Sequence, residues 1–420
     1  MDKCIMVGCD LHDKSMLLKI ASGRLDEAPA AKRLWANNAG ARRAMRADLQ
    51  RRAAEVGARR IVFAYEASGL GFGLHDELTA AGIECHVLAP TKMERSIKNL
   101  FGKTDERDAD AVLRDVVSYV LSGAELPEVW VPPLSIRDDR EPVRLRLEAA
   151  DKLTRIKCQI RCLLKRSGVE QAASSAKPWT GEYVRWLRTW GESSGRPGAG
   201  AALASLLRQM DFAVEELGRL DAVVEALSKT ARYAPLMAAM RTKGVGLLTA
   251  MVLATELGDF GRFKNRRQFG AFLGLAPRSD ESGQTDDRKG RITRQGPSRV
   301  RKVLNQAIWS RVRAGGPDAA KYGRIAARNP KHKKKAVVAV MRDLGIWEWH
   351  RGLEAQLQMG GGSSGAAGPG GPGGVGGASG GPKREVPVVG LAGAAAAAAL
   401  RLPGPAAAGA SGDAPGERCG

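Results

Sequence analysis

The run Cys4-Ile5-Met6-Val7-Gly8-Cys9 is apolar and ends at Asp10. A short apolar run closed by a polar residue is typical of a buried β-strand. A second run, Ile61 to Tyr65, ends in the same way at Glu66. Because residues that follow neighbouring parallel strands meet at one edge of a sheet, these two acids are expected to lie close together.

The rest of the first 128 residues predicts the other parts of such a sheet. Ser15 to Ile20 can pair back on the first strand across a polar turn, and Ile83 to Ala89 has the composition of a further buried strand. Helical composition lies between the strands at Ala39 to Val56 and Gly73 to Ala81. Residues 1–128 are therefore expected to form an α/β domain.

Two more acids, Asp105 and Asp108, fall in the first turn of a helix that is predicted to run towards Val120. Their spacing of three places both on one helix face. Four converging carboxylates repel one another unless a cation such as Mg²⁺ or Mn²⁺ binds them, and paired divalent ions act on phosphodiesters. The set Asp10, Glu66, Asp105 and Asp108 thus predicts a metal site and a nucleic-acid substrate. The alternative is that the helix acids only stabilise the helix dipole and that Glu66 only caps a strand.

The charge of the chain points to the same partner. The 420 residues carry a formal net charge of +21, and the stretch from Arg241 to Arg351 holds 25 Lys and Arg against 9 Asp and Glu. A surface of this kind binds polyanions in a salt-dependent way, although a basic face can also be merely solvated. The length also exceeds that of one ordinary domain, so two or three folded units are expected.

Residues 129–234 have a different character and predict a helical, coiled-coil linker. Apolar residues recur at approximate helical spacing among basic ones from Arg144 to Lys165, and again from Phe212 to Leu227. Trp179, Trp186 and Trp190 lie between these helices and are expected to pack a small helical insert. A platform for stacking bases is the alternative role for these rings.

The six cysteines do not show the paired CxxC spacing of a zinc site. Cys158 and Cys162 are four residues apart in a helical pattern, and we expect them to be core or seam residues. Neither a signal peptide nor an apolar run of about 18 residues is recognisable, so we expect no membrane partner and a cytoplasmic, nucleoid-associated protein.

Residues 235–355 are expected to form a mainly α-helical third unit. Lys243-Gly244-Val245-Gly246 is similar to the turn of a helix-hairpin-helix module, whose backbone amides contact phosphate. Farther on, a polar loop from Ser279 to Lys289 contains Glu281-Ser282-Gly283. A serine flanked by cations is a candidate nucleophile, and its alternative role is a hydroxyl in a surface turn. The cations expected to contact nucleic acid are Arg278, Arg288, Lys289, Arg291, Arg294, Arg299, Arg301 and Lys302.

Residues 356–420 predict a disordered tail, because from Gly360 onwards the chain is mostly Gly, Ala, Pro and Ser. A segment of this composition buries too little apolar surface to offset the entropy that it loses on ordering. No catalytic role is expected there.

Taken in order, several motifs resemble the DEDD transposases of insertion sequences, the family that includes the pilin gene invertases. They are Gly8-Cys9-Asp10, Tyr65-Glu66-Ala67-Ser68-Gly69, Lys103-Thr104-Asp105-Glu106-Arg107-Asp108-Ala109, Leu273-Gly274-Leu275-Ala276-Pro277-Arg278, Ser282-Gly283, Gly290-Arg291-Ile292-Thr293-Arg294-Gln295-Gly296 and the run from Lys334 to Val340. The resemblance covers roughly Met1 to Arg351. Two positions depart from it: Lys243 replaces the proline of the usual Pro-Gly-Ile-Gly turn, and Glu281 precedes Ser282 where a serine is common.

The resemblance implies an RNase H-like, RuvC-type N-terminal domain, a coiled-coil linker and a C-terminal transposase domain. It implies that Asp10, Glu66, Asp105 and Asp108 bind Mg²⁺ and that Ser282 forms a transient phosphoserine link to donor and target DNA, with Ser279 as the other candidate. It further implies a bridge RNA as guide and a tetramer built as a dimer of dimers. A RuvC-like, structure-specific nuclease and a catalytically silent nucleic-acid-binding scaffold are the alternative functions.

Overall fold

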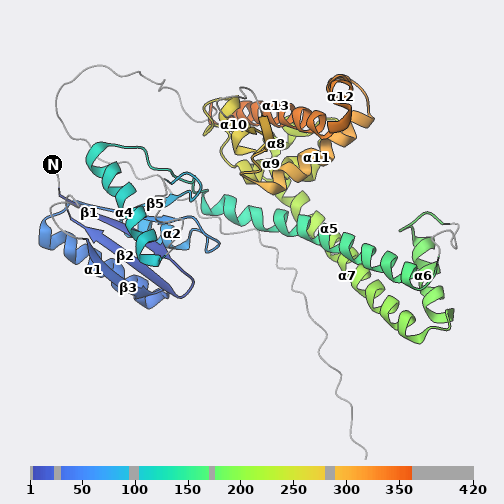
Figure 1. The fold of residues 1–420 in the computed structure, drawn as a ribbon, viewed down its shortest axis with the longest axis horizontal. Coiled ribbons are helices and arrows are strands. Elements are labelled where there is room, and N and C mark those ends of the chain that lie inside the picture. Colours follow the sequence, from blue (N-terminus) through green and yellow to red (C-terminus); the bar gives the residue numbers. More distant parts are fainter. Residues whose placement is uncertain (1–2, 23–29, 94–103, 170–175, 280–288, 362–420) are drawn as a thin grey trace, which may run out of the picture. The chain divides into compact units, whose positions relative to one another are not determined.

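The computed structural model describes residues 3–22, 30–93, 104–169, 176–279 and 289–361. Five strands form one sheet in the order β3-β2-β1-β4-β5 (Figure 1). β1 is antiparallel to β2 and parallel to β4, β2 is antiparallel to β3, and β4 is parallel to β5. The strands are β1 (Cys4–Leu11), β2 (Ser15–Ala21), β3 (Ala31–Ala36), β4 (Arg60–Glu66) and β5 (Glu84–Leu88). The α/β prediction is confirmed, and the topology is compatible with an RNase H-like domain.

Helices cover both faces of this sheet. The side chains of Val7, Cys9, Phe63 and Tyr65 lie in the apolar cluster that also contains residues of α1 (Ala39–Val56) and α2 (Gly73–Ala80). The alternate residues of the same strands share a second cluster with α4 (Asp105–Ser122). This alternation follows from the two-residue period of a strand.

Gly8 allows α4 to approach the sheet closely. A Cβ atom at Gly8 would lie 2.3 Å from the backbone nitrogen of Leu113 and 2.5 Å from the carbonyl oxygen of Ala109. A side chain at this position would therefore push α4 away from the strand. The position of the Asp105 end of α4 thus depends on a glycine two residues before Asp10.

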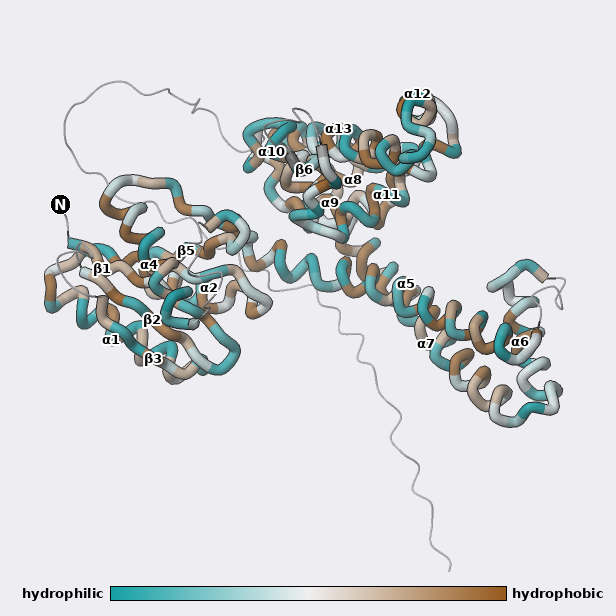
Figure 2. Tube along the Cα trace, viewed as in Figure 1, coloured by the Kyte–Doolittle hydropathy of each residue, from teal (hydrophilic) through white to brown (hydrophobic). Residues whose placement is uncertain are grey.

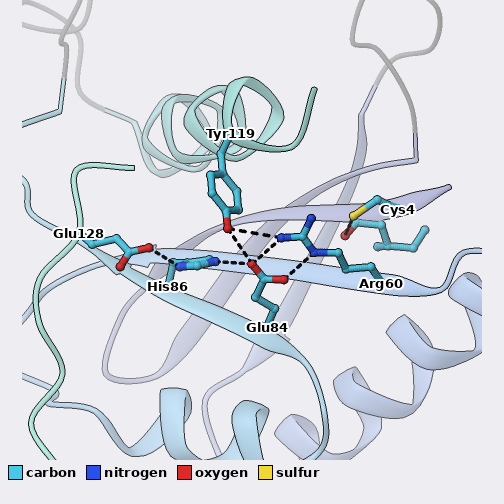
Figure 3. A network of polar contacts seen from close by, with 7 residues as sticks. Cys4, Arg60, Glu84, His86, Tyr119 and Glu128 are labelled. Atoms are coloured by element: carbon cyan, nitrogen blue, oxygen red, sulfur yellow. Dashed lines mark hydrogen bonds and ion pairs between the residues drawn. The ribbon is translucent and has the colours of Figure 1, made fainter. Parts of the chain in front are cut away.

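A polar network joins β4, β5 and α4 at another part of the sheet (Figure 3). The Glu84 carboxylate accepts hydrogen bonds from Arg60 Nε at 2.6 Å and from the Tyr119 hydroxyl at 3.1 Å. His86 lies between two carboxylates, with Nε2 2.9 Å from Glu84 and Nδ1 2.5 Å from Glu128. Through His86, the network connects Glu128, which follows α4, to the strand β5.

The region after this sheet is helical, as predicted. α5 (Leu134–Arg166) and α7 (Pro197–Ser228) lie side by side, and α6 (Gly181–Ser193) packs at one end of the pair (Figure 1). Figure 2 shows hydrophobic residues recurring along both long helices among hydrophilic ones. The rings of Trp179, Trp186 and Trp190 pack against the buried cluster of these helices, as expected. The expectation for Cys158 and Cys162 was wrong: both are exposed, since they face away from the α7 side of α5.

The remaining helices enclose one large apolar core. They are α8 (Ala234–Met240), α9 (Leu247–Leu257), α10 (Arg266–Phe272), α11 (Ser298–Arg313), α12 (Pro317–Arg328), the short 3-10 helix η2 (Pro330–His332) and α13 (Lys334–Gly361), with the small strands β6 (Pro277–Ser279) and β7 (Lys289–Ile292). α9 is buried along most of its length, and the aromatic residues Phe260, Phe269 and Trp349 belong to the same cluster. α13 continues to Gly361, several residues beyond the predicted start of the tail at 356, and residues 362–420 lie outside the described ranges.

Among the described helices, none combines the length and the apolar character that crossing a bilayer requires.

Candidate catalytic site

Asp10 and Glu66 lie at the ends of adjacent parallel strands. In the β1–β4 register Cys9 is paired with Tyr65, so Asp10 and Glu66 are the next residues along. Both have the strand parity of the residues that face α4, such as Met6 and Ala64. The backbone therefore places the two acids at one edge of the sheet, on the side that α4 covers.

α4 brings Asp105 and Asp108 to the same edge. The helix begins after Thr104, whose side chain accepts a hydrogen bond from the backbone N–H of Arg107 at 3.3 Å. Ala109 and Val112 are buried against the sheet, and Asp105 and Asp108 precede them by four residues each. The two acids thus continue the sheet-facing stripe by one turn, towards the end of β1.

The charges of this cluster act on Asp10. Its side chain is only 14% exposed. Burial raises the pKa of Asp10, contact with His12 opposes this, and the nearby carboxylates of Asp105 and Asp108 raise it further, so the pKa lies above its usual range. A bound cation would relieve this repulsion and favour the ionised carboxylate.

His12 also belongs to the cluster, although it was not among the site residues predicted from the sequence. Its Nε2 atom lies 2.9 Å from Asp10 Oδ2 and 3.5 Å from Asp105 Oδ1. The ring is in the turn between β1 and β2, where Asn37 donates a hydrogen bond to the His12 carbonyl oxygen at 2.8 Å. A lone histidine in a turn has no periodic pattern that would indicate such a place; only its distance of two residues from Asp10 was a signal.

The donor set fits a divalent cation. One ligand atom from each of Asp10, His12 and Asp105 lies within 4.8 Å of the others. Carboxylate oxygens suit Mg²⁺ and Mn²⁺, and an imidazole nitrogen favours the softer of the two. Asp108 is close enough to act on the charge of Asp10, and Glu66 is the next residue in strand register.

The second group of predicted site residues lies around a close contact between the chain segments of Gly274 and Gly296, which we call the glycine junction. A Cβ atom on Gly274 would lie 1.9 Å from the carbonyl oxygen of Gln295, and one on Gly296 would lie 1.8 Å from the carbonyl oxygen of Phe272. Both glycines have positive φ, 66° and 83°, which favours glycine at these positions. The segments around Gly274 and Gly296 are therefore packed backbone to backbone.

Hydrogen bonds complete this junction. The N–H groups of Thr293 and Arg294 donate to the carbonyl oxygens of Ala276 at 2.9 Å and Gly274 at 3.2 Å. The Arg301 guanidinium donates to the carbonyl oxygens of Leu273, Gln295 and Gly296. The antiparallel strands β6 and β7 extend from this junction, and residues 280–288 connect them.

The predicted nucleophile Ser282 lies outside the described residues, as does Arg288. The alternative nucleophile Ser279 is the last residue of β6, and Lys289 is the first of β7. Residues 280–288, which we call the Ser282 segment, thus begin and end at the paired strands β6 and β7 next to the glycine junction.

The other predicted nucleic-acid contacts fall into two groups. Arg278, Arg291 and Arg294 are exposed. Arg299 and Lys302 instead pair with Glu148 and Asp151 of α5, and Arg301 binds the junction carbonyls. A role in DNA binding stays a prediction for all six.

The chain also has relatives among known proteins. Residues 237–324 match the family described as Transposase IS116/IS110/IS902. The protein y4qE of Sinorhizobium fredii, whose name places it among transposases, is 31% identical over 307 residues, which cover 72% of this chain and 71% of y4qE. The chain belongs to the IS116/IS110/IS902 transposase family.

Two further transposases similar to this chain come from other bacteria. The transposase of insertion sequence IS1533 from Leptospira borgpetersenii is 24% identical over 251 residues, covering 58% of this chain and 69% of that protein. The transposase of IS1111A from Coxiella burnetii is 26% identical over 224 residues, covering 53% and 58%. The part of the chain that matches the family description, 237–324, contains the glycine junction and all of α11.

Proposed function

We propose that this insertion-sequence transposase cleaves and rejoins DNA at a composite site formed by the acid cluster and the Ser282 segment. The observation that carries the proposal is the meeting of Asp10 and Asp105 around His12, with Asp108 acting on the same charge. In this proposal Asp10, Glu66, Asp105 and Asp108 hold Mg²⁺ or Mn²⁺. The ion, when bound, supplies positive charge beside the reacting phosphate.

The chain's own groups have distinct roles in this reaction. Gly8 and the Thr104 cap fix the start of α4, so the acids approach one another without rearrangement. The Ser282 hydroxyl attacks the DNA phosphorus and loses its proton, a phosphoserine bond forms, and the broken P–O bond releases a strand hydroxyl. Attack of another strand hydroxyl on the phosphoserine reverses these bonds and rejoins the DNA. The exposed cations near the junction support the phosphate contacts.

The proposal extends to domains and partners. It takes residues 1–128 as a RuvC-like domain, 129–234 as a coiled-coil linker and 235–355 as the transposase domain, with a bridge RNA selecting the DNA sites in the bacterial nucleoid. Exposed apolar residues on α5 and α7, among them Leu145 and Phe212, support association of several copies through the long helices. The net charge of +21 supports simultaneous binding of two nucleic acids.

The test is an excision assay in cells that carry the element. The rejoined circular junction is amplified with the wild-type protein, Asp10→Asn and Ser282→Ala at matched expression. We expect junctions from the wild type alone. Asp13→Asn, an exposed acid in the same turn as His12, is the matched control and should excise normally.

Other results would point to a different function. Junctions that survive Ser282→Ala would move the nucleophile to Ser279 or to water, and the latter corresponds to a plain RuvC-like nuclease. Junctions that survive Asp10→Asn would contradict the metal role of the acids. Tight, salt-sensitive DNA binding without cleavage under any metal condition would indicate a silent scaffold.

A further inference from the structure

A groove of about 520 Å³ lies next to the glycine junction. Its volume is within the roughly 300–1,000 Å³ that is usual for small-molecule sites. Leu275 and Ile292, which belong to the two interlocked segments, form one end of the groove. Val337, Val338 and Met341 of α13 form the rest of its apolar lining.

One face of α11 supplies the polar and aromatic part of the groove. Arg301, Asn305 and Trp309 are spaced four residues apart and all three line it. The Trp309 side chain is 36% exposed, and its ring is held by an edge contact with Tyr322 at 5.7 Å between centroids. A large aromatic ring that is packed against a neighbour and still partly exposed is suited to stacking.

Asn305 is exposed beside this ring. Asn305 lines the groove, and in the described part of the chain its amide makes no hydrogen bond to another protein group. An amide is the side chain that can form two complementary hydrogen bonds with the edge of a base.

The charged residues that line the groove are all cations. Arg294, Arg301 and Lys334 contribute, and no acid occurs among the described residues that form it. Arg294 and Lys334 are exposed, whereas Arg301 is engaged with the junction carbonyls. The groove is thus lined by apolar residues, an aromatic ring, an amide and positive charges, which together match a nucleobase and its phosphate.

We propose that this groove binds one unpaired base of the DNA beside the cleaved phosphate, with the base on Trp309, its edge on Asn305 and its phosphate near Arg294 and Lys334. This inference rests on the proposed function, because residues 280–288 start and end at the strands β6 and β7 that lead into the groove lining. A strand that changes partners must be unpaired near the break, and a protein site stabilises that state by stacking the released base.

The test compares the binding of two fluorescein-labelled DNA duplexes, one fully paired and one with a single bulged nucleotide, to the full-length protein in EDTA. Fluorescence anisotropy gives both dissociation constants. A stacked base is expected to make the bulged duplex bind about 5- to 150-fold more tightly. Trp309→Ala should remove this preference, and Trp309→Phe should keep part of it.

Trp347→Ala is the matched control, because Trp347 is 40% exposed and does not line the groove. It should keep the wild-type preference, and circular dichroism should show that each variant is folded. Replacing the bulged nucleotide by 5-iodouracil and irradiating should link the DNA to Trp309.

Three results would overturn the inference: equal affinity of the wild type for the two DNA duplexes, an unchanged preference in Trp309→Ala, or, when the same two duplexes are made of RNA, a preference for the bulge in RNA alone. Because binding is measured without metal, such a failure leaves the proposed cleavage chemistry standing. Conversely, Asp10→Asn should abolish excision and leave the bulge preference intact.

Discussion

Glu348 is the clearest case of a single residue whose charge conflicts with its surroundings. Its side chain is fully buried on α13, and neither carboxyl oxygen meets the geometry of a hydrogen bond in the described structure, although Thr242 is near enough to act on its charge. Burial raises the pKa of Glu348 to about 8, although Arg351 and Arg311 act in the opposite direction. The residue is therefore a neutral acid in the folded protein at neutral pH.

This pKa predicts a specific pH dependence of stability. Between about pH 4.5 and about pH 8 the folded state keeps a proton that the unfolded state has lost, so the free energy of unfolding falls as the pH rises. Glu348→Gln should abolish this contribution, raising the melting temperature relative to wild type at pH 8 and changing it little at pH 5. A difference between the two proteins that is the same at both pH values would show that Glu348 is not neutral.

Substitution of Gly274 tests whether the junction between the Gly274 and Gly296 segments is needed for excision. Gly274→Ala places a Cβ atom where the Gln295 carbonyl oxygen lies, and it also has to adopt φ of 66°. We expect a loss of about 1–3 kcal/mol in stability and loss of excision, because β6 and β7 shift.

Gly315→Ala is the matched control for Gly274. Its φ is 78°, but nothing lies within 4 Å of the added carbon, so only the backbone strain remains. It should lower the melting temperature modestly and keep excision. Equal excision by both variants would mean that the junction does not position the Ser282 segment.

At the scale of elements, His86 joins β5 to the segment that leads out of α4. Burial lowers the pKa of His86, but contacts with Glu128 and Glu84 outweigh it, so the pKa is raised. Hydrogen bonds from Arg60 lower the pKa of Glu84 to about 2, against the opposing effect of burial. His86 and Glu84 are therefore both charged over a common pH range.

The signs of these shifts define that range. The charged His86 adds its full contribution to the free energy of unfolding below its unfolded pKa of about 6.5, and this contribution is lost as the pH rises. The charged Glu84 adds its full contribution above about pH 4.5, and this contribution is lost as the pH falls. His86→Gln should thus lower the melting temperature more at pH 5.5 than at pH 8. His332→Gln, the same substitution at an exposed histidine outside this network, is the control. An equal loss at both pH values for His86→Gln would refute the charged pair.

Elements with a regular apolar pattern or a helical composition were predictable from the sequence, whereas an exposed edge strand was not. β1, β4 and α4 have buried stripes, so their ends, and hence Asp10, Glu66 and Asp105, could be placed. β3 was missed because it is an edge strand with little buried surface, where even Leu34 is 70% exposed. The hydrogen bonds from Arg301 to backbone carbonyl oxygens could not be predicted from the sequence either, because a charge pattern does not distinguish a guanidinium that binds DNA from one that binds the backbone.

At the scale of the whole molecule, the charge of +21 predicts how DNA binding responds to salt. Each neutralised phosphate adds about 0.9 to the slope of log affinity against log salt concentration. The double variant Arg278→Gln, Arg291→Gln, which removes two exposed cations beside the Ser282 segment, should therefore reduce the slope by roughly 1.8. Arg219→Gln, which removes an exposed arginine paired with Glu215, should leave it unchanged. An unaltered slope in the double variant would place the DNA elsewhere.

The composite site is tested most directly by trapping the protein while it is joined to DNA. Protein recovered under denaturing conditions from cells that carry the element is digested, and the peptide that retains a nucleotide is identified by mass spectrometry. We predict a nucleotide on Ser282 in the wild type and none in Asp10→Asn or Ser282→Ala. Recombined DNA without any protein-linked nucleotide, or a linked nucleotide that persists in Ser282→Ala, would contradict the serine intermediate.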